Sequence, residues 1–189
     1  MSATGRRIDS FDVIAFDADD TLWRSEDYFE VAERRFIELV TPYASSGVDV
    51  YAALRATEKA DVPITGYGVK AFTLSMIRAA ITVTNETVPA SVLGEIGEIG
   101  RAMLTEPVQL LDHVPGVLTE VAAACRVVLI TKGDLVHQTR KITTSGIEHH
   151  FSELDIVLEK DAETYARLLQ RFGVPADRFC MVGNSVRSD

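Results

Sequence analysis

The chain has 189 residues, of which 47% are hydrophobic and 25% charged, and its formal net charge is −9. This composition is typical of a globular protein with one good core and a small second unit. The negative charge argues against a nucleic-acid backbone or an anionic membrane as partner. No apolar stretch approaches the about 20 residues of a membrane span. Arg6 and Arg7 precede no apolar signal-peptide core, so we expect a cytoplasmic protein.

The first predicted strand leads directly into a cluster of carboxylates. Four apolar residues, Val13 to Phe16, are followed by Asp17, Asp19 and Asp20. A short apolar run of this kind is typical of a buried strand in a parallel sheet. Residues two apart on an extended chain point the same way, so Asp17 and Asp19 address one volume. Two such carboxylates repel and favour a counter-charge such as Mg²⁺, although the stretch alone is also compatible with an acidic turn.

Residues 25–105 show helical periodicity and no convincing strand. Ser25 is a candidate cap for a first helix that Pro42 closes, and a loop is expected over Asp61 to Gly68. The other predicted helices run over Val48–Lys59, Val69–Val83 and Pro89–Leu104. We therefore predict an all-helical insertion.

Three glycines, Gly94, Gly97 and Gly100, recur at every third position of the last of these helices. A nucleotide-binding glycine loop should follow a strand, and none precedes them. Close approach to a neighbouring helix is the better explanation.

From Pro107 onwards strands and helices alternate. The predicted strands cover residues 126–130, 154–158 and 178–182, and the predicted helices between them end near Thr144 and Phe172. Alternation of this kind predicts an α/β fold with a Rossmann-like, three-layer parallel sheet. The core would comprise residues 1–24 and 106–189, and residues 25–105 would form a helical cap. Because the chain stops straight after a strand, we expect a core that is truncated at its C-terminus.

Each predicted strand end carries a group that phosphoryl transfer requires. Asp17 is the candidate nucleophile, and Asp19 is the candidate general acid and base. Thr131 and Lys132 end the second strand, and Lys160 follows the third, so these three are candidates for binding and neutralising a phosphate. Taken singly, Thr131 could be a helix cap and Lys160 a solvated lysine. Their succession at the strand ends favours a common site.

The loop after the fourth strand offers further oxygen ligands. Asn184 and Asp189 lie in the stretch Gly183–Asp189, which by itself would be read as a turn. With Asp17 and Asp19 they form the candidate set for Mg²⁺.

The pattern Asp-x-Asp-x-Thr at residues 17–21, followed in order by Thr131, Lys160 and the loop Gly183–Asp189, resembles the four motifs of the haloacid dehalogenase superfamily of phosphatases and related hydrolases. The resemblance implies that Asp17 is the nucleophile and Asp19 the acid and base, whose backbone carbonyl also binds Mg²⁺. It implies a helical cap of the first type. Asp20 stands where many members have glycine, and Asn184 where many have Asp, which shifts metal binding towards Asp189.

Asp19 also separates reaction classes within that family, because members that dehalogenate 2-haloacids generally lack an acid at this position. We therefore expect a Mg²⁺-dependent phosphatase of a small phosphorylated metabolite, active as a monomer or homodimer without nucleic-acid or membrane partners. The alternatives are a dehalogenase, a phosphonatase, a phosphomutase or a catalytically weak binding domain. Substrate choice is assigned to the cap, with Tyr67 and Lys70 as candidate substrate-binding residues in a region that could equally be an ordinary surface loop.

Overall fold

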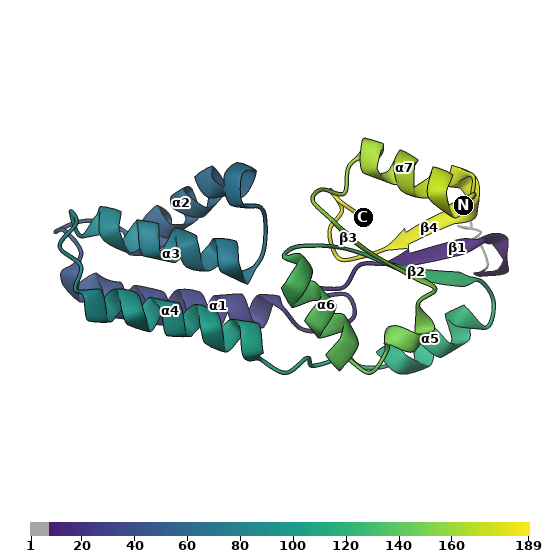
Figure 1. The fold of residues 1–189 in the computed structure, drawn as a ribbon, viewed down its shortest axis with the longest axis horizontal. Coiled ribbons are helices and arrows are strands. Elements are labelled where there is room, and N and C mark those ends of the chain that lie inside the picture. The colour runs from purple at the N-terminus through teal and green to yellow at the C-terminus, as the bar shows by residue number, and fades with distance from the viewer. Residues whose placement is uncertain (1–7) are drawn as a thin grey trace, which may run out of the picture. The chain divides into compact units, whose positions relative to one another are not determined.

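The computed structural model describes residues 8–189, which form two compact units (Figure 1). The core unit contains the described residues up to Arg24 together with Val108–Asp189, and the helical unit contains Ser25–Pro107. Arg6 and Arg7 lie outside the described residues. Within residues 8–189, none of the helices combines the length and the apolar character that crossing a membrane would require.

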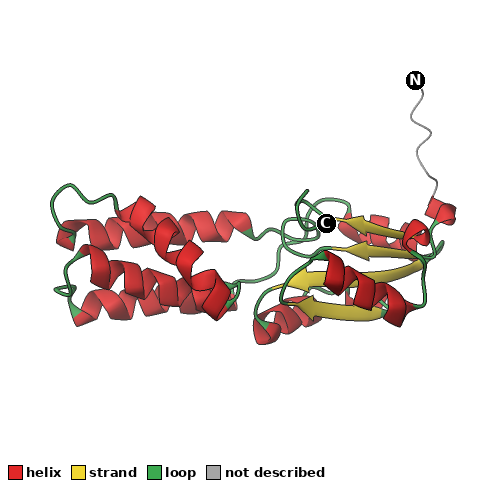
Figure 2. Ribbon diagram, turned by 90° about the horizontal axis from the view of Figure 1, so that it is seen from above, coloured by secondary structure: helices red, strands yellow, loops and turns green. Residues whose placement is uncertain are grey.

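The core unit is built on a four-stranded parallel sheet (Figure 2). Its strands are β1 (Val13–Phe16), β2 (Arg126–Lys132), β3 (Glu153–Val157) and β4 (Phe179–Val182), in the order β3-β2-β1-β4. In the central strand, Ile14 is in register with Val127 on one side and with Cys180 on the other. All strands are parallel, so their carboxyl ends meet at one edge of the sheet.

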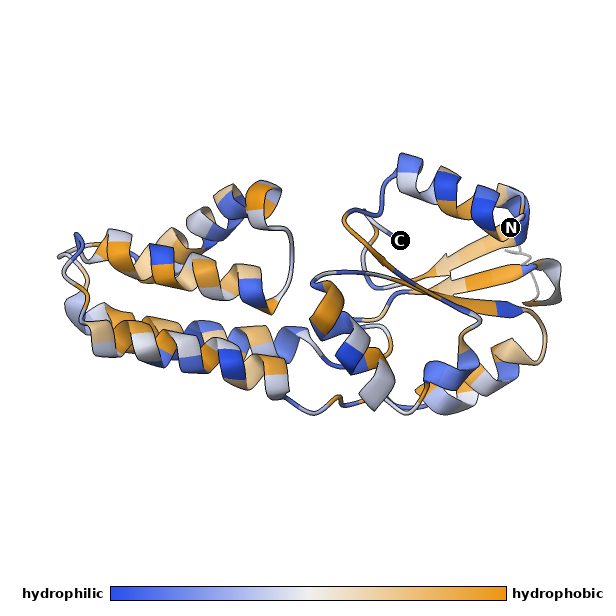
Figure 3. Cartoon of the chain, in the orientation of Figure 1, coloured by the Kyte–Doolittle hydropathy of each residue, from blue (hydrophilic) through white to orange (hydrophobic). Residues whose placement is uncertain are grey.

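Alternate residues of the strands pack on opposite faces of the sheet, which produces three layers. Ile14 and Phe16 pack with residues of α5 (Val114–Ala122) and α6 (Leu135–Thr144), whereas Val13 and Ala15 pack with residues of α7 (Ala162–Phe172). Figure 3 shows mostly apolar strands beside an α7 whose outer surface is polar. The predicted α/β fold with a three-layer parallel sheet is confirmed.

Local signals in the sequence explain where the helices of the core unit begin and end. The side chain of Asp134 accepts a hydrogen bond from the backbone N–H of His137 at 2.9 Å and caps α6. Asp161 caps α7 through the N–H of Thr164 at 2.8 Å, and Gly173 ends that helix with a φ of 67°. Short 3₁₀ segments occur at Ile8–Ser10, Thr41–Tyr43, Glu148–His150 and Ala176–Arg178.

The helical unit consists of four helices around their own apolar core. The helices are α1 (Glu26–Val40), α2 (Val50–Thr65), α3 (Val69–Val83) and α4 (Ala90–Thr105). One residue from each helix is completely buried in this core: Phe36, Leu54, Met76 and Ile96. This part of the chain contains no strand, as its periodicity predicted.

The predicted loop over Asp61–Gly68 is wrong in its first part, because α2 continues to Thr65 through Pro63. The reason is a tertiary contact. The buried carboxylate of Asp61 accepts a hydrogen bond from the hydroxyl of Ser75 at 3.0 Å and pairs with Arg78, both on α3. These bonds hold the end of α2 against α3 despite the lost N–H of proline. The helix ends only at Gly66, which has a φ of 73°.

Only one of the three periodic glycines lies at a close contact between two helices. A Cβ atom at Gly100 would lie 2.1 Å from the hydroxyl oxygen of Thr73 on α3, so α3 and α4 could not pack this closely with a larger residue. At Gly94 and Gly97 no atom lies within 4 Å of such a Cβ. The predicted close approach therefore holds at Gly100 and is wrong at the other two positions.

Candidate active site

The carboxyl edge of the sheet gathers polar side chains from all four strands of the core unit. Asp17 directly follows β1, and its backbone N–H donates to the carbonyl of Val182 at 2.8 Å, which extends the pairing between β1 and β4 to this residue. Thr131 lies at the end of β2, and Lys160 follows β3. The fold thus brings these strand ends to one edge of the sheet.

At the centre of this edge a buried lysine bridges two carboxylates. The Nζ atom of Lys160 lies 2.5 Å from Oδ1 of Asp17 and 2.5 Å from Oδ1 of Asp189. Its side chain is only 2% exposed. One ammonium therefore serves two carboxylates, and the three groups together retain an excess of negative charge when all are ionised.

Burial raises the pKa of Asp17 above its ordinary value, because desolvation outweighs the opposing attraction of Lys160, and the charge of Asp189 acts in the same direction as desolvation. A hard divalent cation would relieve this excess charge, and carboxylate oxygens are the ligands that it prefers. The donor set of Asp17 and Asp189 therefore fits Mg²⁺. Among residues 8–189, no group of three or more His, Cys, Asp or Glu side chains converges as a complete metal cluster.

The loop after β4 folds back so that Asp189 reaches this lysine. Oδ2 of Asp189 accepts a hydrogen bond from the N–H of Ser185 at 2.9 Å. The hydroxyl of Tyr165 on α7 donates to the carbonyl of Ser188 at 2.7 Å, and burial raises the pKa of this tyrosine far above its ordinary value. A Cβ atom at Gly183 would lie 2.3 Å from Cγ of Asp189, so this turn requires glycine.

Asn184, the other candidate metal ligand in this loop, is not brought to the lysine. Its side chain is exposed and makes no hydrogen bond with any residue that the structure describes. Of the two candidates, Asp189 is the one that lies beside Asp17 through their shared lysine.

Asp19 is held by three donors. The indole N–H of Trp23 donates to its Oδ1 at 2.7 Å, the amide of Gln138 donates to its Oδ2 at 2.8 Å, and Lys141 pairs with Oδ1. Burial alone would raise the pKa of Asp19, but Lys141, together with Gln138 and Trp23, outweighs it and lowers this pKa below its ordinary value. Asp17 and Asp19 are therefore shifted in opposite directions.

Thr131 is buried beside the same network. The Nε2 atom of Gln138 lies 3.2 Å from the Thr131 hydroxyl and 2.6 Å from the backbone carbonyl of Lys132. Lys132 itself is partly exposed, and its Nζ lies 3.5 Å from a carboxylate oxygen of Glu159. The structure thus connects the end of β2 to Asp19 through one side chain of α6.

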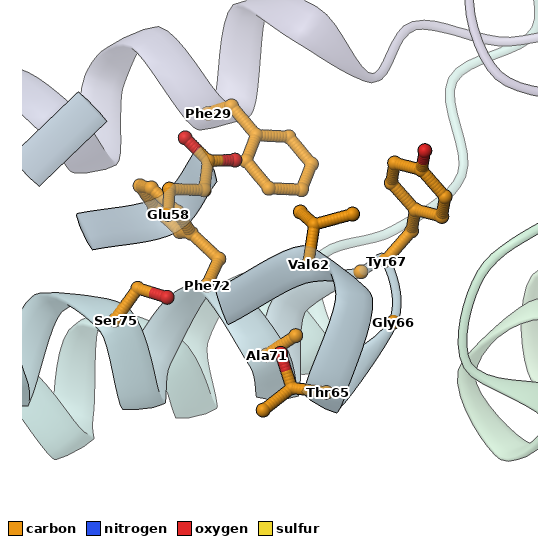
Figure 4. A pocket seen from close by; sticks show the side chains of 10 residues that line it. Phe29, Glu58, Val62, Thr65, Gly66, Tyr67, Ala71, Phe72 and Ser75 are labelled. Carbon is orange, nitrogen blue, oxygen red and sulfur yellow. The ribbon is translucent and has the colours of Figure 1, made fainter. Parts of the chain in front are cut away.

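The two candidate substrate-binding residues of the predicted cap belong to the helical unit. Tyr67 lies between α2 and α3 and lines a small cavity of about 30 Å³ with Phe29, Glu58 and Phe72 (Figure 4). Burial raises the pKa of Glu58. Lys70 is exposed in the first turn of α3. The cavity is large enough for about one water molecule.

Three residues of this site were not singled out from the sequence: Trp23, Gln138 and Lys141. The signal that could have found the last two is their spacing. They stand three positions apart and so share one face of the helix that follows Thr131. Trp23 closes the acidic stretch after β1, and Lys141 lies over its ring at 5.7 Å.

Comparison with known proteins agrees with this architecture. A family model described as haloacid dehalogenase-like hydrolase matches residues 11–189. A crystal structure of a haloacid dehalogenase-like family hydrolase from Xanthomonas campestris is 46% identical, with a TM-score of 0.90 over 95% of this chain and 76% of that one. No significant match is found among curated proteins.

More distant structures share the fold. A predicted phosphoglycolate phosphatase from Haemophilus somnus is 17% identical, with a TM-score of 0.62 over 95% of this chain and 79% of that one. A 2-haloacid dehalogenase from Pseudomonas syringae is also 17% identical, with a TM-score of 0.61 over 93% and 78% of the two chains. Proteins of similar fold thus include one named as a predicted phosphatase and one named as a dehalogenase.

Proposed function

The chain belongs to the haloacid dehalogenase-like hydrolases, and from this premise we propose that it is a Mg²⁺-dependent phosphatase of a small phosphomonoester. The observation that carries the proposal is the second carboxylate, Asp19, fixed by three donors two residues after Asp17. A dehalogenase needs a nucleophile but no acid for a halide leaving group. An alkoxide leaving group needs a proton, and the proposal assigns its delivery to Asp19.

In the first step the Asp17 carboxylate attacks phosphorus and the bond to the ester oxygen breaks, with Asp19 giving its proton to the departing oxygen. In the second step Asp19 takes a proton from water, which attacks phosphorus, releases inorganic phosphate and restores Asp17. Lys160 stabilises the charge on Asp17 and on the phosphoryl oxygens nearby, and Thr131 donates to one of these oxygens. Asp17 and Asp189 would hold Mg²⁺, which supplies further neutralisation of the phosphoryl charge.

The lowered pKa of Asp19 means that this carboxylate is ionised in the free protein. That form suits the base of the second step. The acid of the first step needs a proton, and an arriving phosphate dianion favours its uptake because a like charge raises the pKa of a neighbouring carboxylate. The two roles of Asp19 are then separated by the presence of the substrate.

The partner in this proposal is a small phosphorylated metabolite, handled in the cytoplasm. The core unit supplies the chemistry, and Tyr67 and Lys70 of the helical unit are proposed to select the part of the substrate beyond the phosphate. Neither a nucleic acid nor a membrane is required.

The test is release of phosphate from p-nitrophenyl phosphate with Mg²⁺, run beside EDTA-treated protein and the Asp17→Asn variant. We expect turnover that requires both the metal and Asp17. Chloride release from 2-chloropropionate without metal would instead identify a dehalogenase. A folded protein that catalyses neither reaction would indicate a binding domain.

A further inference from the structure

We propose that Gln138 and Lys141 are positioning residues, which together fix the acid and base Asp19 and couple it to the phosphate-binding end of β2. This inference rests on the proposed phosphatase function and adds a second element, α6, to its machinery. Neither side chain needs to touch the reacting atoms. Both act through Asp19.

The first argument is the origin of the three donors on Asp19. One of them, Trp23, comes from the same loop as Asp19 and is itself buried in the core of the unit. The other two come from α6, which lies more than a hundred residues further along the chain. The orientation of the Asp19 carboxylate therefore also depends on where α6 places Gln138 and Lys141.

The second argument is that both side chains are themselves fixed. Gln138 is only 3% exposed, and its amide also contacts the carbonyl of Lys132 at 2.6 Å. The side chain of Lys141 is 14% exposed, and its ammonium lies over the fully buried ring of Trp23. A cation in this position is attracted by the ring, so Lys141 is held from two sides. A catalytic group requires this kind of support to stay in its productive geometry.

The third argument is the shared amide of Gln138. Its Nε2 atom lies within 3.2 Å of three acceptors, on Asp19, Thr131 and Lys132. An amide group carries only two hydrogens, so it cannot serve all three equally. A phosphate oxygen that engages the Thr131 hydroxyl changes this sharing and thereby the hydrogen bond to Asp19. Gln138 thus connects phosphate binding with the acid and base.

A purely structural role of the two residues makes a different prediction. If they only stabilised the fold, their loss would slow every substrate to a similar extent. If they position an acid, their loss matters most when the leaving group is basic, because such a group must be protonated as it departs. Phenyl phosphate and p-nitrophenyl phosphate have nearly the same shape, but phenolate is the more basic leaving group.

The experiment measures kcat/KM for both esters with Mg²⁺ in the full chain and in the variants Lys141→Met and Gln138→Leu. We expect kcat/KM for phenyl phosphate to fall at least about tenfold further than for p-nitrophenyl phosphate, which is a part of the about 10² to 10⁴ that a general acid contributes. Lys141→Arg should keep the positive charge and so recover most of the kcat/KM that Lys141→Met loses with phenyl phosphate. Arg140→Met removes a positive charge from an exposed neighbour on α6 and should leave the ratio of the two esters unchanged.

Equal losses for the two esters in a folded Lys141→Met variant would overturn this inference and leave the proposed function standing. A parental protein that releases no phosphate from either ester would overturn both. Should Gln138→Leu fail to fold, Lys141→Met and its arginine rescue decide the question alone, because Lys141 is the less buried of the two.

Discussion

Replacing Lys160 by methionine tests the electrostatic centre of the site. The substitution keeps the length and the apolar part of the side chain but leaves the carboxylates of Asp17 and Asp189 without their common cation. Removing one partner of a buried ion pair costs about 3–5 kcal/mol of unfolding free energy, because the remaining charge stays buried. At about 2–4 °C per kcal/mol for a chain of this size, the midpoint of thermal unfolding should fall by roughly 6–20 °C.

Tryptophan fluorescence is a suitable assay for this unfolding. The protein has a single tryptophan, Trp23, which is buried in the core unit beside the site. Its fluorescence therefore reports unfolding of the unit that carries Lys160. The matched control is Lys132→Met at the same sheet edge, where a partly exposed lysine lies 3.5 Å from Glu159. Surface pairs of this kind contribute about 0–1 kcal/mol.

A divalent cation should partly reverse the effect. Without Lys160, Asp17 and Asp189 form a more negative oxygen site, so Mg²⁺ at millimolar concentration should raise the unfolding midpoint of Lys160→Met more than that of the parental protein. Activity should remain lost, because Mg²⁺ cannot replace the lysine at its own position. If Lys160→Met is no less stable than Lys132→Met, the lysine does not neutralise the two carboxylates and the account of the site is wrong.

Three further predictions concern individual residues of the same edge. Asp17→Asn should abolish phosphate release. Because the pKa of Asp17 is raised, its ionisation opposes folding, so the stability of the variant relative to the parental protein should rise as the pH increases above 3.8. Urea titrations over this pH range check the sign. Asp19→Asn should lower turnover by about 10² to 10⁴. Because the pKa of Asp19 is lowered, the variant should also be less stable than the parental protein above pH 3.8, and this loss of stability should disappear as the pH falls below the pKa of Asp19. A loss of stability that persists in acid would contradict this. Gly183→Ala should displace Asp189, cost about 1–3 kcal/mol of unfolding free energy and raise the Mg²⁺ concentration for half-maximal activity. The control Gly116→Ala lies inside α5, where a Cβ meets nothing within 4 Å; it should raise the unfolding free energy by about 0.5–1 kcal/mol and leave the metal titration unchanged.

The sheet could be predicted because its strands are continuous apolar runs. Val13–Phe16 and the run that ends at Thr131 are buried on both faces, and this type of strand has a clear signature in sequence. The end of α2 could not be predicted in the same way. Pro63 and the glycines after it signal a loop locally, and the contact of Asp61 with α3 that keeps the helix intact is visible only in three dimensions.

The residues of the candidate site also divide into those that could be predicted from the sequence and those that could not. Asp17 and Lys160 each follow a strand, and parallel topology brings them to one edge. Asp189 joins them because the loop after β4 also folds back. Gln138 and Lys141 lie on a helix, where polar residues are common and usually face solvent. Only the fold shows that this face of α6 turns inwards to Asp19.

The central position of β1 has a consequence for how the protein loses activity. This strand is hydrogen-bonded on both sides, and the pairing with β4 continues to the amide of Asp17. Amide hydrogens in such a strand exchange with solvent only when the whole unit opens, whereas helices at the periphery open in smaller fluctuations. We therefore expect Asp17, the proposed nucleophile, to be anchored in a slowly exchanging segment. Gln138 and Lys141, which we propose orient Asp19, belong to a helix that we expect to open more readily. On heating, we expect Asp19, the proposed acid and base, to lose its alignment while Asp17 is still in place.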